Sequence, residues 1–254
     1  MTYLYVYAAV AGKVDAAALA GVPTLPDGGV PRALGLDRSV SLIVADVPPA
    51  IYNAETLETR LADLDWVAEC GVAHHAVSDA LAETSVVLPM RLFTLFSSEA
   101  VALATLRRST SAIAAALKRV TGQQEWVLRI GRPETARLDT GAAKAPGVPS
   151  GTSFLRAKAD ARREEAERAQ RVTTGAAQVY DTLRGLANAA TTRVIEPGNT
   201  LLVDAAFLIA ATKAAAFQEA LSTAAAGLLR DGCPVSLTGP WPPYSFAAVE
   251  DTNG

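Results

Sequence analysis

The chain has 254 residues, of which 50% are hydrophobic and 19% charged, with a formal net charge of -3. A chain of this length and apolar content can bury one large core or two of ordinary domain size. The small negative charge, with basic residues scattered among acidic ones, gives no long-range attraction for polyanions and argues against nucleic acid as a main partner.

The N-terminus and the cysteines favour a reduced, cytoplasmic protein. Residues 1–10 have no cationic start before their apolar stretch, so we expect no signal peptide. The most apolar later stretch, 201–211, contains Asp204 and has about half of the roughly 20 residues that a membrane-spanning helix needs. We therefore expect it in the core and expect no contact with a lipid membrane. Cys70 and Cys233 show no paired spacing, and nothing favours an oxidising compartment.

The chain opens with strand patterns and then changes to a helical one. Residues 2–10 place tyrosines at alternate positions between apolar residues, which predicts a central strand covered on both faces. A second β-prone run follows at 39–47 and stops at two prolines. Over 54–83 the apolar spacing becomes three or four residues, which predicts a helix that Gly71 could bend or interrupt. One face of this helix contains Leu64, Val67, Cys70, His74, Val77 and Leu81.

Three further elements complete the first half. A short β-branched run at 85–92 precedes a helix that Ser97 or Ser98 caps and that extends to residue 120. A strand at 124–130 then closes this half. The order of elements predicts an α+β domain of ferredoxin-like kind.

A stretch rich in Gly, Pro and Ala without apolar periodicity predicts the domain boundary. The expected organisation is an N-terminal α+β domain over 1–133, a linker over 134–150, and a C-terminal α+β domain over 151–254 that ends in a segment rich in proline and aromatic residues. The second domain begins with a long helix over 152–188, which we expect to be interrupted at 173–175. Its other predicted elements are strands at 192–195, 201–209 and 234–238 and a helix over 212–230.

The long helix carries clustered charges of both signs. Glu164, Glu165 and Glu167 are interleaved with arginines at spacings of three and four residues. This pattern is typical of a solvated face with ion pairs, and a docking ridge for a partner is the sharper alternative. The apolar positions of the helix are too uneven for a heptad, so a coiled-coil scaffold is not favoured and the oligomeric state stays open.

Two adjacent histidines are the main candidates for acid-base chemistry. His74 lies on the apolar stripe of the predicted helix and His75 points about 100° away, so the two cannot easily bind one metal ion. We expect a core histidine at position 74 and a surface one at 75. The alternative is a small-molecule enzyme that uses His74 with Asp79 or Glu83. The sequence contains no phosphate-binding loop, dinucleotide fingerprint or nucleophile elbow.

The segment 239–246 combines three prolines with three aromatic residues. Prolines fix an extended backbone and present the aromatic side chains at low entropic cost. Trp241, Tyr244 and Phe246 either pack back on their own domain to seal a sheet edge or form an aromatic surface for a protein partner.

Ordered landmarks along nearly the whole chain carry a family resemblance. In the first half they are Tyr3-Leu4-Tyr5, Ala73-His74-His75-Ala76-Val77, Val87-Leu88-Pro89-Met90-Arg91-Leu92-Phe93-Thr94 and Gln124-Glu125-Trp126-Val127. In the second half they are Gly151-Thr152-Ser153-Phe154-Leu155-Arg156-Ala157-Lys158, Ala205-Ala206-Phe207-Leu208 and Gly239 to Phe246. In this order they resemble the gas vesicle proteins of the GvpL/GvpF type.

The resemblance implies two α+β domains, no catalytic residue, no metal and no cofactor. It also implies a role in gas vesicle formation through contacts with the small apolar shell protein and other accessory proteins. The expected role is a chaperone or nucleation factor that engages the shell protein early, because an apolar subunit aggregates in water until it is incorporated. A minor structural component retained on the vesicle shell is the alternative within the family.

Overall fold

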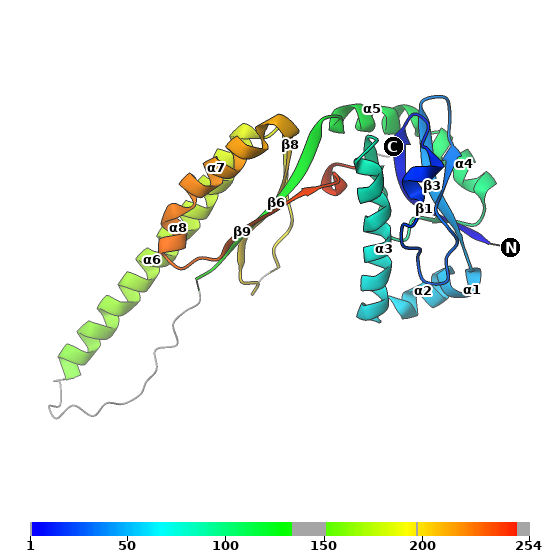
Figure 1. Cartoon of the computed structure of the whole chain (residues 1–254). Helices are drawn as coiled ribbons and strands as arrows, with labels where there is room; N and C mark the ends of the chain where they lie inside the picture. The colour runs from blue at the N-terminus through cyan, green and yellow to red at the C-terminus, as the bar shows by residue number, and fades with distance from the viewer. Residues whose placement is uncertain (1, 134–150, 197, 248–254) are drawn as a thin grey trace. The chain divides into compact units, whose positions relative to one another are not determined.

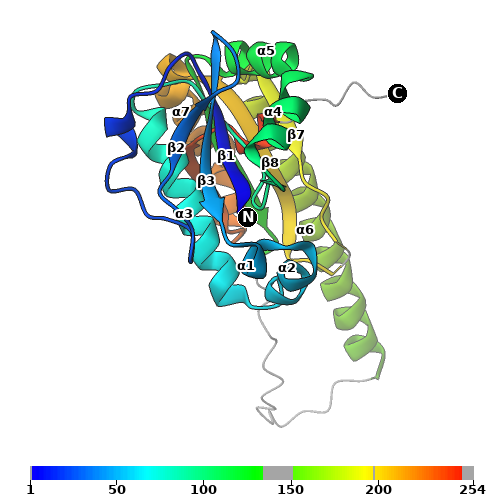
Figure 2. The same ribbon diagram turned by 90° about the vertical axis from the view of Figure 1, so that its right-hand side faces the viewer.

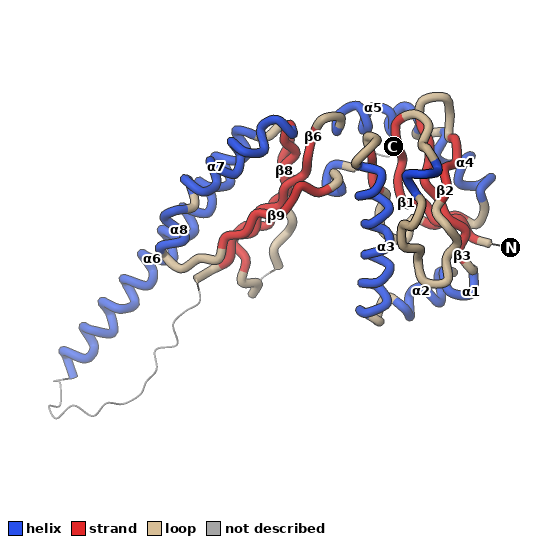
Figure 3. The backbone as a smooth tube through the Cα atoms, viewed as in Figure 1, coloured by secondary structure: helices blue, strands red, loops and turns tan. Residues whose placement is uncertain are grey.

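The computed structural model describes residues 2–133, 151–196 and 198–247. Its contacts divide the chain into two compact units, Met1–Glu125 with Pro240–Gly254 and Trp126–Gly239. Each unit contains a sheet packed with helices, as Figures 1 and 3 show, and the expected α+β class with two such sheets is confirmed. The linker expected over 134–150 lies outside the described residues.

This division differs from the expected domains at two places. Strand β6 (Gln123–Gly131), which we expected to close the first sheet, lies in the second one, because Trp126, Leu128 and Ile130 belong to the core of the second unit. The segment from Pro240 onward belongs to the first unit, although the sequence placed it in the C-terminal domain.

The first sheet is built around β1. Its strand order is β2-β3-β1-β4, and β5 also pairs with β1. The strands are β1 (Tyr3–Ala11), β2 (Arg32–Gly35), β3 (Val40–Val47), β4 (Val87–Pro89) and β5 (Leu95–Phe96). Because β1 pairs antiparallel with β3 on one side and with β4 and β5 on the other, the predicted central strand is observed. The sequence pattern did not predict β2, which follows a passage rich in Gly and Pro.

Helices cover both faces of β1. α3 (Leu64–Ala82) packs on the face that carries Tyr5 and Tyr7, whereas α4 (Glu99–Arg107) and α5 (Thr110–Val120) pack on the face that carries Leu4 and Val6 (Figures 1 and 2). A register shift between Val6 and Ala8 lets neighbouring residues of β1 reach the α3 side together.

Two predicted helices are broken at positions that the periodicity does not mark. The helix expected over 54–83 consists of α2 (Ala54–Arg60) and α3, and the break lies before Asp63, whose side chain caps the Trp66 N–H. α3 runs through Gly71 without interruption. The helix expected to extend to residue 120 likewise consists of α4, which Ser98 caps, and α5. The short elements η1 (Ala16–Leu19) and α1 (Pro49–Tyr52) complete the first unit up to Glu125.

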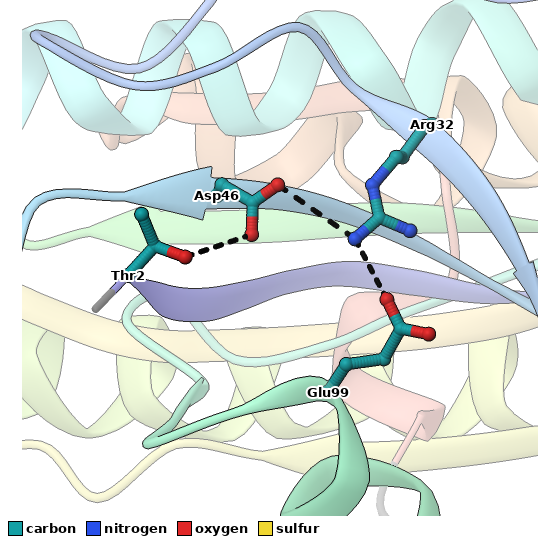
Figure 4. A network of polar contacts seen from close by, with 4 residues as sticks. All are labelled: Thr2, Arg32, Asp46 and Glu99. Carbon is teal, nitrogen blue, oxygen red and sulfur yellow. Dashed lines mark hydrogen bonds and ion pairs between the residues drawn. The ribbon is translucent and has the colours of Figure 1, made fainter.

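A polar network fastens the edge strand β2 to its neighbours (Figure 4). The Arg32 guanidinium donates to Glu99 at 2.8 Å and lies 3.7 Å from the Asp46 carboxylate, which accepts from the Thr2 hydroxyl at 3.3 Å. The network joins β2, β3 and the first turn of α4. Its members are largely exposed, so each pair contributes at most about 1 kcal/mol.

The second unit has helices on one face of its sheet (Figure 1). The strand order is β7-β8-β6-β9, so β6 lies between β8 and β9, and β7 pairs with β8. The three strands besides β6 are β7 (Ala189–Thr192), β8 (Leu201–Ala210) and β9 (Val235–Trp241). The helices are α6 (Gly151–Leu186), α7 (Ala214–Ala224) and α8 (Ala226–Arg230), with η2 (Ala211–Lys213) before α7. Residues 205–209 of β8 are buried, so the prediction of a core element for the apolar stretch is confirmed.

The interruption expected in the long helix is absent, because α6 continues through 173–175. A Cβ on Gly175 would lie 3.1 Å from Leu228 of α8, so the glycine allows a close approach of the two helices. Residues 155–171 are exposed on every side, and Arg163 pairs with Glu167 at 3.0 Å. This agrees with a solvated face that carries ion pairs.

Asp204, the carboxylate within the apolar stretch, has two cationic neighbours. It lies 3.5 Å from Arg129 Nε of β6 and 3.4 Å from Arg193 Nη1, which follows β7. The two arginines balance its charge on a sheet surface where its own side chain is only 14% exposed.

Glycines in the helices offer a direct test of this packing. Gly71 of α3 and Gly185 of α6 have open space at the Cβ position, so replacing either with Ala should raise the free energy of unfolding by about 0.5–1 kcal/mol. A Cβ on Gly131 would lie 2.6 Å from the Pro234 ring, so Gly131→Ala should lower it by about 1–3 kcal/mol. Chemical unfolding followed by circular dichroism measures both effects. A loss of stability in Gly71→Ala would contradict the open space at the Cβ position of Gly71.

Candidate interaction surface

The C-terminal segment Pro240–Ala247, called the tail below, is fastened to the first unit by a buried carboxylate. Glu125 is 2% exposed and accepts two hydrogen bonds from Ser245, one from its N–H at 2.8 Å and one from its hydroxyl at 2.7 Å. Arg119 of α5 donates to the Phe246 carbonyl at 2.9 Å. Hydrogen bonds to charged groups are the stronger ones in proteins, so these contacts hold the tail in one place.

The aromatic residues of the tail lie against α3. The Tyr244 hydroxyl is 3.2 Å from His75 Nδ1, and the Trp241 ring centroid is 5.3 Å from that of His75. Burial raises the pKa of Tyr244 to about 12. Trp241 is 39% exposed, whereas Tyr244 and Phe246 are partly buried. The tail therefore packs on α3 of the first unit, whereas the interpretation that it packs back placed it on its own predicted domain.

His75 links the tail to α3. Its Nε2 lies 3.2 Å from the Asp79 carboxylate, and its Nδ1 faces the Tyr244 hydroxyl. Asp79, one of the two carboxylates that we considered as partners for His74, is thus placed beside His75.

His74 lies inside the first core. It is 3% exposed, accepts from the Tyr5 hydroxyl at Nδ1 (2.7 Å) and donates from Nε2 to the Met90 carbonyl (3.1 Å). Burial lowers the pKa of His74 to about 4, although the bond to Met90 acts in the opposite direction. Both nitrogens of the neutral ring have partners within the core, as expected for a core histidine.

The same network holds the loop between β4 and β5. Phe93 adopts a positive φ of 64° and donates its N–H to the Tyr5 hydroxyl at 3.3 Å. Its ring stacks on Trp66 of α3 with centroids 5.5 Å apart. A positive φ is costly for a bulky residue, so these contacts compensate for the strain.

The outward face of α3 is apolar beside the tail. Leu64 is 77% exposed and Val72 is 67% exposed, and the exposed Ala68 lies one helical turn from each. One turn further on is His75, which Trp241 contacts. We call this set the α3–tail surface; it consists of Leu64, Ala68, Gly71, Val72, His75 and Trp241. The sequence singled out the aromatic tail but did not reveal this row, because its residues are too far apart to form an apolar run.

The described part of the chain holds no group of three or more His, Cys, Asp or Glu side chains that could bind a metal ion. Among residues 2–133, 151–196 and 198–247, no helix combines the length and the hydropathy needed to cross a membrane.

Comparisons with known proteins agree on one family. Residues 3–248 match the family described as gas vesicle synthesis protein GvpL/GvpF. Gas vesicle protein L of Streptomyces sp. (strain CB03234) is 30% identical over 236 residues, which cover 89% of this chain and 86% of that protein. Gas vesicle protein L2 of Halobacterium salinarum is 30% identical over 246 residues, which cover 88% and 87%.

Two crystal structures of gas vesicle protein GvpF share the fold. The protein from Anabaena sp. PCC7120 superposes with a TM-score of 0.70 at 14% identity, covering 100% of this chain and 99% of that one. The protein from Microcystis aeruginosa gives a TM-score of 0.58 at 15% identity, covering 98% and 100%.

The depressed pKa of His74 predicts how stability depends on pH. Unfolding restores the ordinary pKa of about 6.5, so between pH 6.5 and about 4 the unfolded chain binds a proton that the folded chain does not. Stability should fall as pH is lowered through this window, by roughly 3 kcal/mol at its lower end. Urea unfolding at several pH values measures how the free energy of unfolding depends on pH. His74→Gln has no imidazole at this position and should lack the decrease that His74 causes between pH 6.5 and about 4. Equal slopes in the two proteins would contradict the assignment.

Ser245 should control whether the tail stays bound. Ser245→Ala removes one hydrogen bond to a buried carboxylate and should lower stability by about 1–3 kcal/mol. Trp241 is the partly exposed tryptophan, since Trp66 and Trp126 are 7% and 6% exposed. Acrylamide quenching should therefore increase in Ser245→Ala. Ser236→Ala, at an exposed position of β9, serves as the control, and equal quenching in both variants would argue against the anchor.

Proposed function

Because the chain belongs to the GvpL/GvpF family of gas vesicle synthesis proteins, we propose that it assists gas vesicle assembly by binding the small apolar shell protein. Membership of this family implies a role in gas vesicle formation, and the resemblance read from the sequence is confirmed. We further propose that the chain binds the shell protein and other accessory proteins, and that it does so early in vesicle assembly.

The observation that carries the proposal is the exposure of the α3–tail surface. Leu64 and Val72 expose most of their apolar side chains, and Trp241 adds part of an indole at the end of the same row. Exposed apolar surface of this kind marks protein interaction sites, and tryptophan is enriched in their centres. Of the three tail aromatics proposed for binding, Trp241 is the most exposed, whereas Tyr244 and Phe246 are partly buried.

The chemistry of the shell explains why such a surface would be useful. A subunit that presents an apolar face to gas aggregates in water until it is incorporated. A protein that covers this face reversibly prevents aggregation and delivers the subunit, and this requires complementary surfaces but no reaction. In this proposal the protein acts as a chaperone or nucleation factor in the cytoplasm, next to growing vesicles, and needs neither a cofactor nor a lipid membrane or nucleic acid as partner.

Co-purification with the shell protein tests the proposal. The tagged chain should retain the shell protein in the soluble fraction, and little should remain on washed intact vesicles. Trp241→Ala should reduce retention at least several-fold, because it removes the exposed aromatic contact, while the chain stays folded by circular dichroism.

Val30→Ser provides the matched control, since Val30 is 73% exposed on the first unit and is not a member of the α3–tail surface. If the wild-type chain retained no shell protein in solution but remained on washed vesicles, the role of a retained structural component would replace the proposed one. If it did neither, and vesicle formation were normal without it, binding of the shell protein would be excluded.

A further inference from the structure

The outward face of α3 carries charge of one sign. Asp65 and Glu69 each follow a member of the apolar row, Leu64 and Ala68, by one position. They therefore form a second row along one border of the apolar one, and both are exposed. Leu64–Ala82 contains no Lys or Arg, and the pair within α3, between His75 and Asp79, does not involve Asp65 or Glu69.

Helix stability accounts for only part of this acidity. Asp63 caps α3 and Asp65 lies in its first turn, where negative charge is favourable. Glu69 lies beyond the first turn and gains little from the helix dipole. Its position beside Ala68 leaves a carboxylate along the border of an exposed apolar face, where a cation from a partner would be attracted.

The middle of the row can accept a close approach. Ala68 and Gly71 are small, and a Cβ built on Gly71 meets no atom within 4 Å. Larger side chains stand on both sides, Leu64 towards the N-terminus and Val72 with Trp241 towards the C-terminus. Two helices pack at interaxial distances of about 8–10 Å, and small residues at the crossing point favour the shorter distances.

We propose that the α3–tail surface binds an amphipathic helix of the shell protein whose apolar face is bordered on one side by Lys or Arg. This inference deepens the proposed function and rests on it. The apolar side chains of the partner helix cover Leu64 and Val72 and lie over Gly71. Its cations face Asp65 and Glu69, and Trp241 closes the end of the site.

Two peptides of about 20 residues provide the probe, because this length gives a helix of about 30 Å. Both have the same apolar face of Leu and Ala; Lys borders it in one peptide and Glu in the other. Fluorescence anisotropy with the full-length chain should give about tenfold tighter binding of the Lys peptide. The preference should shrink at high salt and in Glu69→Lys. Equal affinities for the two peptides would overturn the charge assignment.

A glycine substitution separates binding from folding. Gly71→Ala should raise the melting temperature but weaken binding of the Lys peptide several-fold, since the added methyl group points to the partner. Gly185→Ala is the matched control, which should raise the melting temperature and leave binding unchanged. The double variant Leu64→Ser/Val72→Ser should bind neither peptide. Full binding by that double variant would remove the surface from consideration.

The outcomes distinguish this inference from the proposed function. If Leu64→Ser/Val72→Ser still retained the shell protein in co-purification, the surface would be wrong and the function would stand. If the wild-type chain bound the Lys peptide but retained no shell protein, the proposed function would be contradicted. The surface would then bind a different partner.

Discussion

The hydrogen bond from the Tyr5 hydroxyl to His74 fixes the rotation of α3, and the first unit depends on that rotation. The ring of His74 can accept from β1 and donate to the Met90 carbonyl only when this side of the helix faces the sheet. Burial keeps the ring neutral, because a charged imidazole would lose its hydration without a carboxylate to balance it. The polar core contact and the exposed row on the opposite side are therefore two consequences of one orientation.

The tail depends on a second buried polar contact. Glu125 is placed by β6, and its carboxylate accepts from both the backbone and the hydroxyl of Ser245. A buried charge without such donors would be strongly destabilising, so the tail and the carboxylate stabilise each other. The tail in turn brings Trp241 to the end of the α3 row, where the aromatic ring extends a surface that α3 alone would leave narrow.

The sequence predicted what local periodicity controls and missed what distant contacts control. The alternation around Tyr5 was enough to place β1 inside a sheet. The spacing of Cys70, His74 and Val77 gave most of the buried face of α3 correctly, but Leu64, which the same spacing placed on that face, is 77% exposed. The short strand β2 was missed because strands of this length carry little pattern. The partnership of Glu125 with Ser245 joins positions 120 residues apart, and no local signal indicates it. The aromatic tail was recognised by composition, but composition does not say which helix it covers.

The second unit is an insertion between Glu125 and Pro240 of the first. Ribosomes make proteins from the N-terminus, so β1, α3 and Glu125 are synthesised long before the serine that caps the carboxylate. Closing so long a loop has an entropic cost that the folded insertion reduces, because it replaces a flexible connection with an ordered one. The surface that includes Trp241 is thus assembled only after both units have been made. A nascent chain exposes an incomplete version of it, so a partner of the proposed surface would meet the complete site only after both units have been synthesised.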